Sequence, residues 1–149
     1  MKLDQTDVKI LKHLLTDARL SNRKIAEAVG VSVGTVITRI QKMEQEEIIN
    51  GYSVILDHEK LGFELTTITE ITVSKGKLLE VEKDIAKMPN VCAVYDVTGL
   101  TDAMVIVKSK TRKELSDFVK TVLAMPFVER TNTHVVLTTV KEDYRGFIE

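Results

Sequence analysis

Between Arg19 and Lys42 the sequence gathers side chains that could bind a polyanion. Five positions in this stretch are lysine or arginine and only Glu27 is acidic, so the local charge is +4. The whole chain carries a formal net charge of −1. A basic face within a nearly neutral protein is what a module that contacts nucleic-acid phosphates requires. The five bases are Arg19, Arg23, Lys24, Arg39 and Lys42.

The same stretch has the spacing of a helix-turn-helix. Ser21 and Ser32 are good N-cap residues, because a serine hydroxyl accepts hydrogen bonds from the first N–H groups of a helix. Ala26 is small enough for two helices to cross closely, Gly30 suits a tight left-handed turn, and Val36 would lock the second helix onto the first. We therefore expect one helix from Ser21 to Gly30 and a second from Ser32 to about residue 46.

The second of these helices would enter the major groove of DNA with its N-terminal half. Outward hydroxyls can bond to bases or phosphates, Arg39 could read a guanine or bind a phosphate, and amides at Val33 and Gly34 could bind a phosphate oxygen. Arg23 and Lys24 are better placed for backbone contacts, which position a protein without reading sequence. The predicted DNA-binding residues are Ser21, Arg23, Lys24, Ser32, Val33, Gly34, Thr35, Thr38, Arg39 and Lys42. The alternative is a solvated helical hairpin with incidental charge.

One more helix is expected ahead of this motif. Asp4 is a candidate N-cap, because aspartate accepts hydrogen bonds from helix N–H groups as serine does. The apolar residues that follow recur at helical spacing, and the helix should fade around Asp17. These apolar residues are Val8, Leu11, Leu14 and Leu15.

The second half of the chain predicts a sheet with two helices. Residues 48–56 are rich in β-branched types and contain Asn50-Gly51, which indicates a turn and a strand that connect the two halves. The order that follows is β-α-β-β-α-β, which is typical of a ferredoxin-like fold with both helices on one face of an antiparallel sheet. A partner subunit is expected to cover the other face, which keeps apolar and threonine side chains. The expected strands are 65–73, 91–97, 103–107 and 128–140, and the helices are 77–87 and 115–123.

These elements predict an α+β protein with two domains. A winged or helix-turn-helix DNA-binding domain should occupy residues 1–50, and a connecting strand or linker should occupy residues 51–62. A ferredoxin-like domain for effector binding and oligomerisation should occupy residues 63–149.

Composition excludes several other classes of protein. Charged residues make up 29% of the chain and hydrophobic ones 44%, which is normal for a globular protein. The apolar runs are too short for a membrane span, and the first ten residues lack the apolar core of a signal peptide. The single cysteine, Cys92, is expected to be a small buried hydrophobe in a cytoplasmic protein. His13, His58 and His134 have no ligand spacing, so we expect no metal site and no cofactor.

The sequence resembles the Lrp/AsnC family of feast/famine regulators along essentially its whole length. The N-terminal stretches that carry the resemblance are LDQTDVKIL, DARLSNRKIAEAVGVSVGTVITRIQKME and IINGYSVILDHEKLGF. The C-terminal stretches are VYDVTGLTD and RTNTHVVLTTVK. Glu47 departs from the pattern, since many members have glycine there, and we expect Asn50-Gly51 to supply the flexible turn instead.

The resemblance implies a sequence-specific regulator of transcription that binds double-stranded DNA and responds to an amino acid or related small metabolite. It also implies a homodimer that assembles to an octamer, with the effector bound between subunits. A loop amide can bind the α-carboxylate of such an effector, and Asp102 can bind its ammonium group. The alternative is that Gly99 and Asp102 serve only to build a β-turn. The effector-binding residues that the resemblance implies are Thr98, Gly99, Leu100, Thr101, Asp102, Thr131 and Thr133.

Two other functions fit parts of the sequence. An architectural protein would wrap DNA through many binding heads without responding to an effector. Some sirohaem decarboxylases look like this family, and such an enzyme would need arginine and histidine in the C-terminal cleft, where Arg130 and His134 are the near candidates. We expect a regulator that is not an enzyme, has no membrane partner, and is cytoplasmic and nucleoid-associated.

Overall fold

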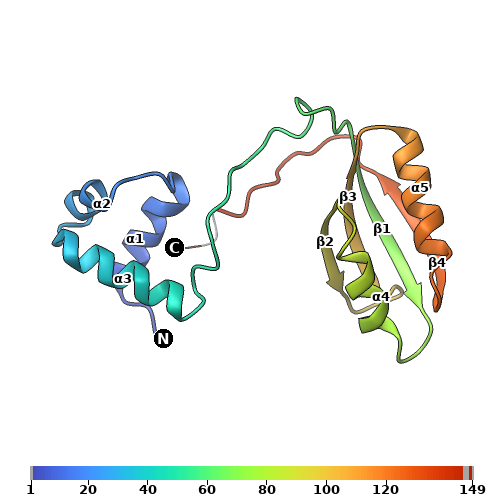
Figure 1. The fold of residues 1–149 in the computed structure, drawn as a ribbon, viewed down its shortest axis with the longest axis horizontal. Coiled ribbons are helices and arrows are strands. Elements are labelled where there is room, and N and C mark those ends of the chain that lie inside the picture. Colours follow the sequence, from blue (N-terminus) through green and yellow to red (C-terminus); the bar gives the residue numbers. More distant parts are fainter. Residues whose placement is uncertain (1, 146–147, 149) are drawn as a thin grey trace. The chain divides into compact units, whose positions relative to one another are not determined.

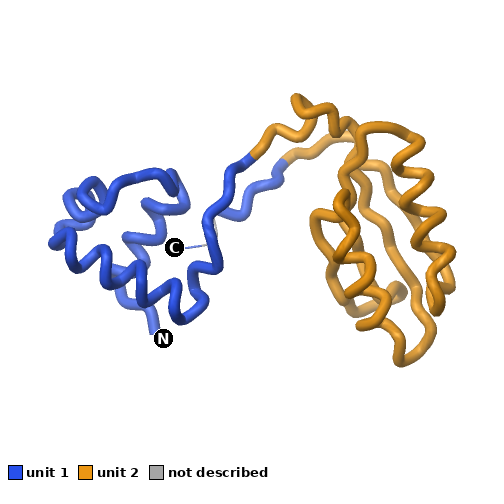
Figure 2. Tube along the Cα trace, viewed as in Figure 1, with its two compact units in different colours: residues 1–55, 141–149 blue, residues 56–140 orange. Residues whose placement is uncertain are grey.

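The computed structural model describes residues 2–145 and 148 of the chain. It divides into two compact units, coloured separately in Figure 2. The N-terminal unit ends at Ile55 and takes in the chain again from Lys141, and the sheet unit runs from Leu56 to Val140. Ile148 packs against the apolar core of the N-terminal unit. Among the described residues, no helix is long and apolar enough to cross a membrane.

Three helices build the N-terminal unit, with no strand among its described residues (Figure 1). Each begins at the predicted cap: side-chain oxygens of Asp4, Ser21 and Ser32 accept hydrogen bonds from backbone N–H groups of the first helical turn. Gly30 ends the second helix with φ of 80°, a left-handed conformation that favours glycine. The helices are α1 (Gln5–Thr16), α2 (Asn22–Val29) and α3 (Val33–Gln45).

The core of this unit is small and apolar. Ile25 of α2 and Val36 of α3 are fully buried, which confirms the close packing predicted for the helix-turn-helix. Burial of each such side chain contributes about 1.5–3 kcal/mol. The buried core residues are Ile10, Leu11, Ile25, Ala26, Val36 and Met43.

The turn after α3 forms at Glu47 itself. This residue has φ of 55°, in the left-handed region, and the N–H of Ile48 donates to the carbonyl of Met43 at 2.9 Å. The expectation that Asn50-Gly51 would replace a glycine at position 47 is therefore wrong for the turn that ends the helix. Residues 50–57 form no strand, contrary to prediction, because no partner strand in the described chain pairs with them.

The sheet unit has the predicted β-α-β-β-α-β order. Its four strands are antiparallel and lie in the order β2-β3-β1-β4 (Figure 1). The strands are β1 (Leu65–Val73), β2 (Val91–Asp96), β3 (Ala103–Ser109) and β4 (Val128–Val135). The helices are α4 (Leu78–Ile85) and α5 (Arg112–Leu123).

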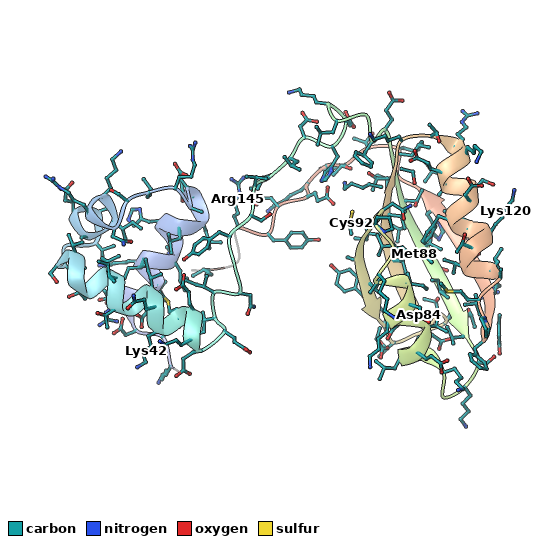
Figure 3. All side chains as sticks on the ribbon, in the orientation of Figure 1. Lys42, Asp84, Met88, Cys92, Lys120 and Arg145 are labelled. Carbon is teal, nitrogen blue, oxygen red and sulfur yellow. The ribbon has the colours of Figure 1, made fainter. Side chains whose placement is uncertain are left out.

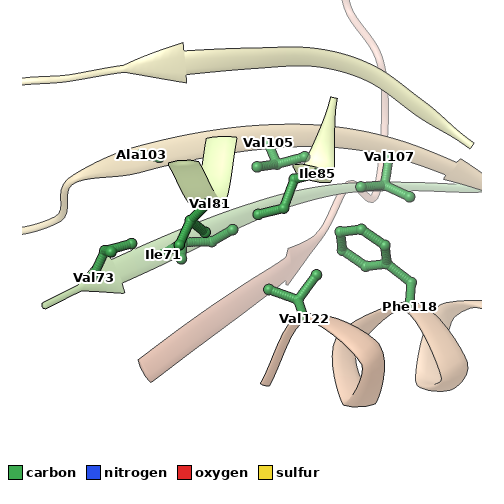
Figure 4. Packing of buried hydrophobic residues seen from close by; sticks show 9 residues of the cluster. All are labelled: Ile71, Val73, Val81, Ile85, Ala103, Val105, Val107, Phe118 and Val122. Atoms are coloured by element: carbon green, nitrogen blue, oxygen red, sulfur yellow. The ribbon is translucent and has the colours of Figure 1, made fainter. Parts of the chain in front are cut away.

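Both helices pack on one face of this sheet. Figure 4 shows Ile85 of α4 and Phe118 of α5 beside Ile71, Val105 and Val107 of the strands, and all five are buried. Side chains alternate along a strand, so the neighbours of these strand residues lie on the opposite, open face of the sheet. That face carries Ile68 and Glu70 of β1. It also carries Met104 of β3, which pairs with Glu70.

Two features of the sheet depart from expectation. β4 ends at Val135 instead of Val140, because its partner β1 begins at Leu65 and the last bond joins Val136 N–H to the carbonyl of Thr66. Cys92 is exposed instead of buried (Figure 3). It lies on the edge strand β2, where the pairing register shifts between Val91 and Ala93.

Candidate nucleic-acid interface and ligand hollow

Of the ten residues predicted to bind DNA, eight are exposed, and Thr35 and Arg39 are half-buried. All ten lie at the starts of α2 and α3 or along the outer face of α3. The Ser21 hydroxyl accepts a bond from Lys24 N–H at 3.3 Å, and the Ser32 hydroxyl accepts one from Thr35 N–H at 3.1 Å. The two serines thus build the helix ends that present the other residues.

The charged members of this set differ in their surroundings. Arg23 forms an exposed ion pair with Glu27 at 3.2 Å, and an exposed pair of this kind contributes little stability. Lys24 and Lys42 are exposed, and Figure 3 shows Lys42 on α3. These side chains can reach a phosphate without breaking a buried contact.

Arg39 is instead held by two aspartates of the α1 terminus. Its Nη1 donates to Oδ2 of Asp4 at 2.7 Å and to Oδ1 of Asp7 at 2.8 Å, and the Asp7 side chain is 2% exposed. The bond to Asp7, and then the bond to Asp4, raise the pKa of Arg39. The bond from Asp7 N–H and the Arg39 guanidinium lower the pKa of Asp4. Arg39 thus links α3 to the start of α1. In the sequence, only the two acids Asp4 and Asp7 could have indicated this role.

A hollow of about 580 Å³ lies between the start of α1 and the outer face of α3. It brings together five of the predicted DNA-binding residues and adds Lys2, which the sequence did not single out. Hydroxyls and cations around a concave surface can accept a phosphate or the edge of a base. The residues that line this α1–α3 hollow are Lys2, Asp4, Asp7, Gly34, Thr35, Thr38, Arg39 and Lys42.

The loop predicted to bind an effector borders a second hollow, of about 800 Å³, in the sheet unit. Thr98, Leu100 and Thr101, three of the residues that the family resemblance implies for the effector, line it together with Glu70 and Asp96. No lysine, arginine or histidine is among its lining residues. We call it the sheet hollow; it is lined by Glu70, Asp96, Val97, Thr98, Leu100, Thr101 and Met104.

Asp102 anchors this loop to β1. Its Oδ2 accepts the Val73 N–H at 2.8 Å, and its own N–H donates to the carbonyl of Ile71 at 3.0 Å. The Thr101 hydroxyl donates to the same carbonyl at 2.9 Å, and Gly99 has φ of 126°. The turn therefore has a rigid base, and Asp102 lies in that base and does not line the hollow.

The structure does not bring Thr131 and Thr133 to the sheet hollow. Thr131 pairs with buried Ile71, and the Thr133 hydroxyl lies 3.1 Å from that of Thr69, so both threonines are on the helix-covered face. Their neighbours Asn132 and His134 are on the open face and contact Glu70, at 3.3 Å and 3.2 Å. A shift of one residue along a strand exchanges the faces, and sequence alone left that register open.

Comparison with known proteins agrees with both halves of this description. Residues 3–50 match a family model described as winged helix-turn-helix DNA-binding. Residues 66–146 match the model of the Lrp/AsnC ligand binding domain.

Relatives match the chain along almost its full length. An uncharacterized HTH-type transcriptional regulator of Pyrococcus furiosus is 48% identical, covering 97% of this chain and 98% of its own. Among solved structures, a transcriptional regulator of Neisseria meningitidis in complex with L-methionine has a TM-score of 0.88 at 26% identity, covering 97% and 96%. LrpC of Bacillus subtilis has a TM-score of 0.85 at 29% identity, covering 95% and 99%.

The fold, the capped helix-turn-helix and these matches lead to one assignment. The chain belongs to the Lrp/AsnC family of helix-turn-helix transcriptional regulators, with a DNA-binding module followed by a ligand-binding domain.

Proposed function

We propose that the protein reads an operator in double-stranded DNA with α3 and that a small amino-acid-like effector modulates this binding from the sheet hollow. The observation that carries the proposal is the exposed outer face of α3, where hydroxyls and Lys42 surround a concave surface. Thr35 and Thr38 would contact base edges in the major groove. Arg23, Lys24 and Lys42 would bind phosphates and set the position of the helix.

The sheet hollow suits a ligand that carries an ammonium group. Its charged lining residues are Glu70 and Asp96, so these carboxylates would attract the ammonium of an amino acid, while Asp102 holds the loop. The loop amides and the Thr98 hydroxyl would bind the carboxylate, while the Thr101 hydroxyl stays bonded to the Ile71 carbonyl and Met104 offers apolar contact. The L-methionine complex of the Neisseria meningitidis relative supports this class of effector.

We further propose that two copies of the chain pair through the open face of the sheet and that such dimers assemble to an octamer. The face keeps Ile68 36% exposed beside the polar contacts of Glu70, which is the mixture that subunit interfaces use. An effector at this interface would shift assembly only through different affinities for the assembled states. We propose no enzymatic role and no cofactor, and a cytoplasmic, nucleoid-associated location.

Fluorescence anisotropy with an operator selected from random palindromic DNA tests these proposals. The protein should prefer the operator to scrambled DNA at several salt concentrations, and Lys42→Ala should weaken binding. Lys120→Ala on α5 makes the same charge change in the sheet unit and should leave binding unchanged. Equal affinity for every sequence at each salt concentration would contradict operator reading. Equal affinity with no response to any amino acid would indicate an architectural, DNA-wrapping role.

A further inference from the structure

We infer that two cations of the α1–α3 hollow have different roles. Lys2 binds a DNA phosphate beside Lys42, whereas Arg39 is a positioning residue that fixes the angle of α3. This inference rests on the proposed DNA binding by α3. It assigns a contact to the chain ahead of α1, and it removes the one arginine of α3 from base reading.

The contacts of Arg39 argue against a base-reading role. An arginine that reads guanine presents its guanidinium as a two-pronged donor to two acceptor atoms of the base. Nη1 of Arg39 is already shared between Asp4 and Asp7, at 2.7 and 2.8 Å. Moving this side chain toward DNA would leave Asp7, whose side chain is 2% exposed, buried without its cation.

The phosphate-binding role of Lys2 follows from the charges that line the hollow. The hollow is lined by three bases and two acids, and the acids are the pair that already binds Arg39. The cations that can face a phosphate are therefore Lys2, ahead of α1, and Lys42, on α3. Lys2 is exposed. Two lysines beside a hydroxyl-lined surface match the arrangement in which backbone contacts flank a reading element.

The salt dependence of DNA binding separates the two roles. Each phosphate contact adds about 0.9 to the slope of log K against log salt concentration, so Lys2→Ala should reduce the slope by about 1 and weaken binding at low salt. Lys9→Ala removes an exposed lysine of α1 that does not line the hollow, and its slope should equal that of the unaltered protein. The protein should carry no N-terminal tag.

Arg39 is tested with two substitutions on the same operator. Arg39→Gln should lower the melting temperature and the affinity for DNA but keep the salt slope. The variant loses the ion pairs with Asp4 and Asp7 and loses no phosphate contact. Arg39→Lys keeps a cation beside Asp7 and should restore both quantities with the same base preferences. If Arg39→Gln does not fold, Arg39→Lys alone decides, since loss of preference at one base pair would show that the guanidinium reads DNA.

Three results would overturn the inference: an unchanged slope for Lys2→Ala, a slope reduced by about 1 for Arg39→Gln at an unchanged melting temperature, or lost base preference for Arg39→Lys. In each case the unaltered protein still binds its operator. Absence of operator binding by the unaltered protein would instead contradict the proposed function itself.

Discussion

Nη1 of Arg39 lies 2.8 Å from Oδ1 of Asp7, and this contact joins the helix proposed to read DNA to a buried carboxylate in the first turn of α1. Asp7 also accepts the Asp4 N–H at 2.9 Å, while Asp4 accepts the Asp7 N–H at 2.9 Å. A reciprocal capping box therefore holds the carboxylate in place. The angle of α3 depends on a cap that lies more than thirty positions away in the sequence.

Asp7→Asn should destabilise the N-terminal unit by about 2 kcal/mol, between the values typical of exposed and of fully buried ion pairs. The asparagine oxygen can still accept the Asp4 N–H, so the change removes mainly the charge that Arg39 requires. Urea unfolding measured by circular dichroism checks the value. Glu27→Gln removes an exposed partner of Arg23 and should change stability by less than about 0.5 kcal/mol. Equal effects of the two substitutions would show that the Asp7–Arg39 contact stabilises the unit no more than an exposed ion pair does.

Gly34→Ala should stabilise the fold and weaken DNA binding. A Cβ at this position would meet only Ser32 Oγ, at 3.9 Å, so the packing of the protein does not require glycine there. Alanine in place of glycine favours a helix by about 0.5–1 kcal/mol. The added methyl group would occupy the α1–α3 hollow where the groove of DNA approaches. Thermal melting and anisotropy should therefore move in opposite directions, and unchanged affinity would place DNA elsewhere on the unit.

Glu47→Gly should stabilise the N-terminal unit by about 0.5–1 kcal/mol, because a left-handed conformation strains any residue with a Cβ. Gly30→Ala is the reciprocal test, since Gly30 has φ of 80° at the end of α2 and should lose a similar amount. Both are measured by thermal unfolding of the full chain. A less stable Glu47→Gly variant would show that the glutamate side chain contributes more than its backbone strain costs.

Local signals predicted most of the fold. Ser21, Gly30 and Ser32 mark helix ends through bonds within four residues of each cap, and alternation along β1 reflects burial against α4 and α5. Such features depend on the nearest chain, so the sequence displays them directly.

The parts that prediction missed depend on distant residues. The Asp7–Arg39 pair joins two separate helices. The face of Thr131 follows from its pairing with Ile71, because a register shift of one residue would place Asn132 there instead. The segment 50–57 has strand-like composition but no pairing partner within the chain, and composition cannot supply one.

Tyr52 should ionise about two pH units above an ordinary tyrosine. Partial desolvation of the hydroxyl, and then its hydrogen bond of 2.9 Å to the Glu44 carboxylate, raise the pKa of Tyr52 to about 12. Both effects disfavour the phenolate, so the contact between the end of α3 and the connector persists as pH rises through the ordinary tyrosine range. Tyr95 and Tyr144 are the other tyrosines, and replacing both with phenylalanine isolates the signal.

In that background, near-ultraviolet absorbance at about pH 11 should show less than about a fifth of the phenolate expected for a free tyrosine, with circular dichroism confirming that the helices persist. Glu44→Gln should lower the pKa of Tyr52, because the amide removes the negative charge opposite the phenolate, but partial desolvation should keep it above the ordinary value. Glu59→Gln, on an exposed residue of the sheet unit, is the matched control and should leave the titration unchanged. Ordinary ionisation in the Glu44-containing protein would mean that Tyr52 does not tie the connector to α3 in solution.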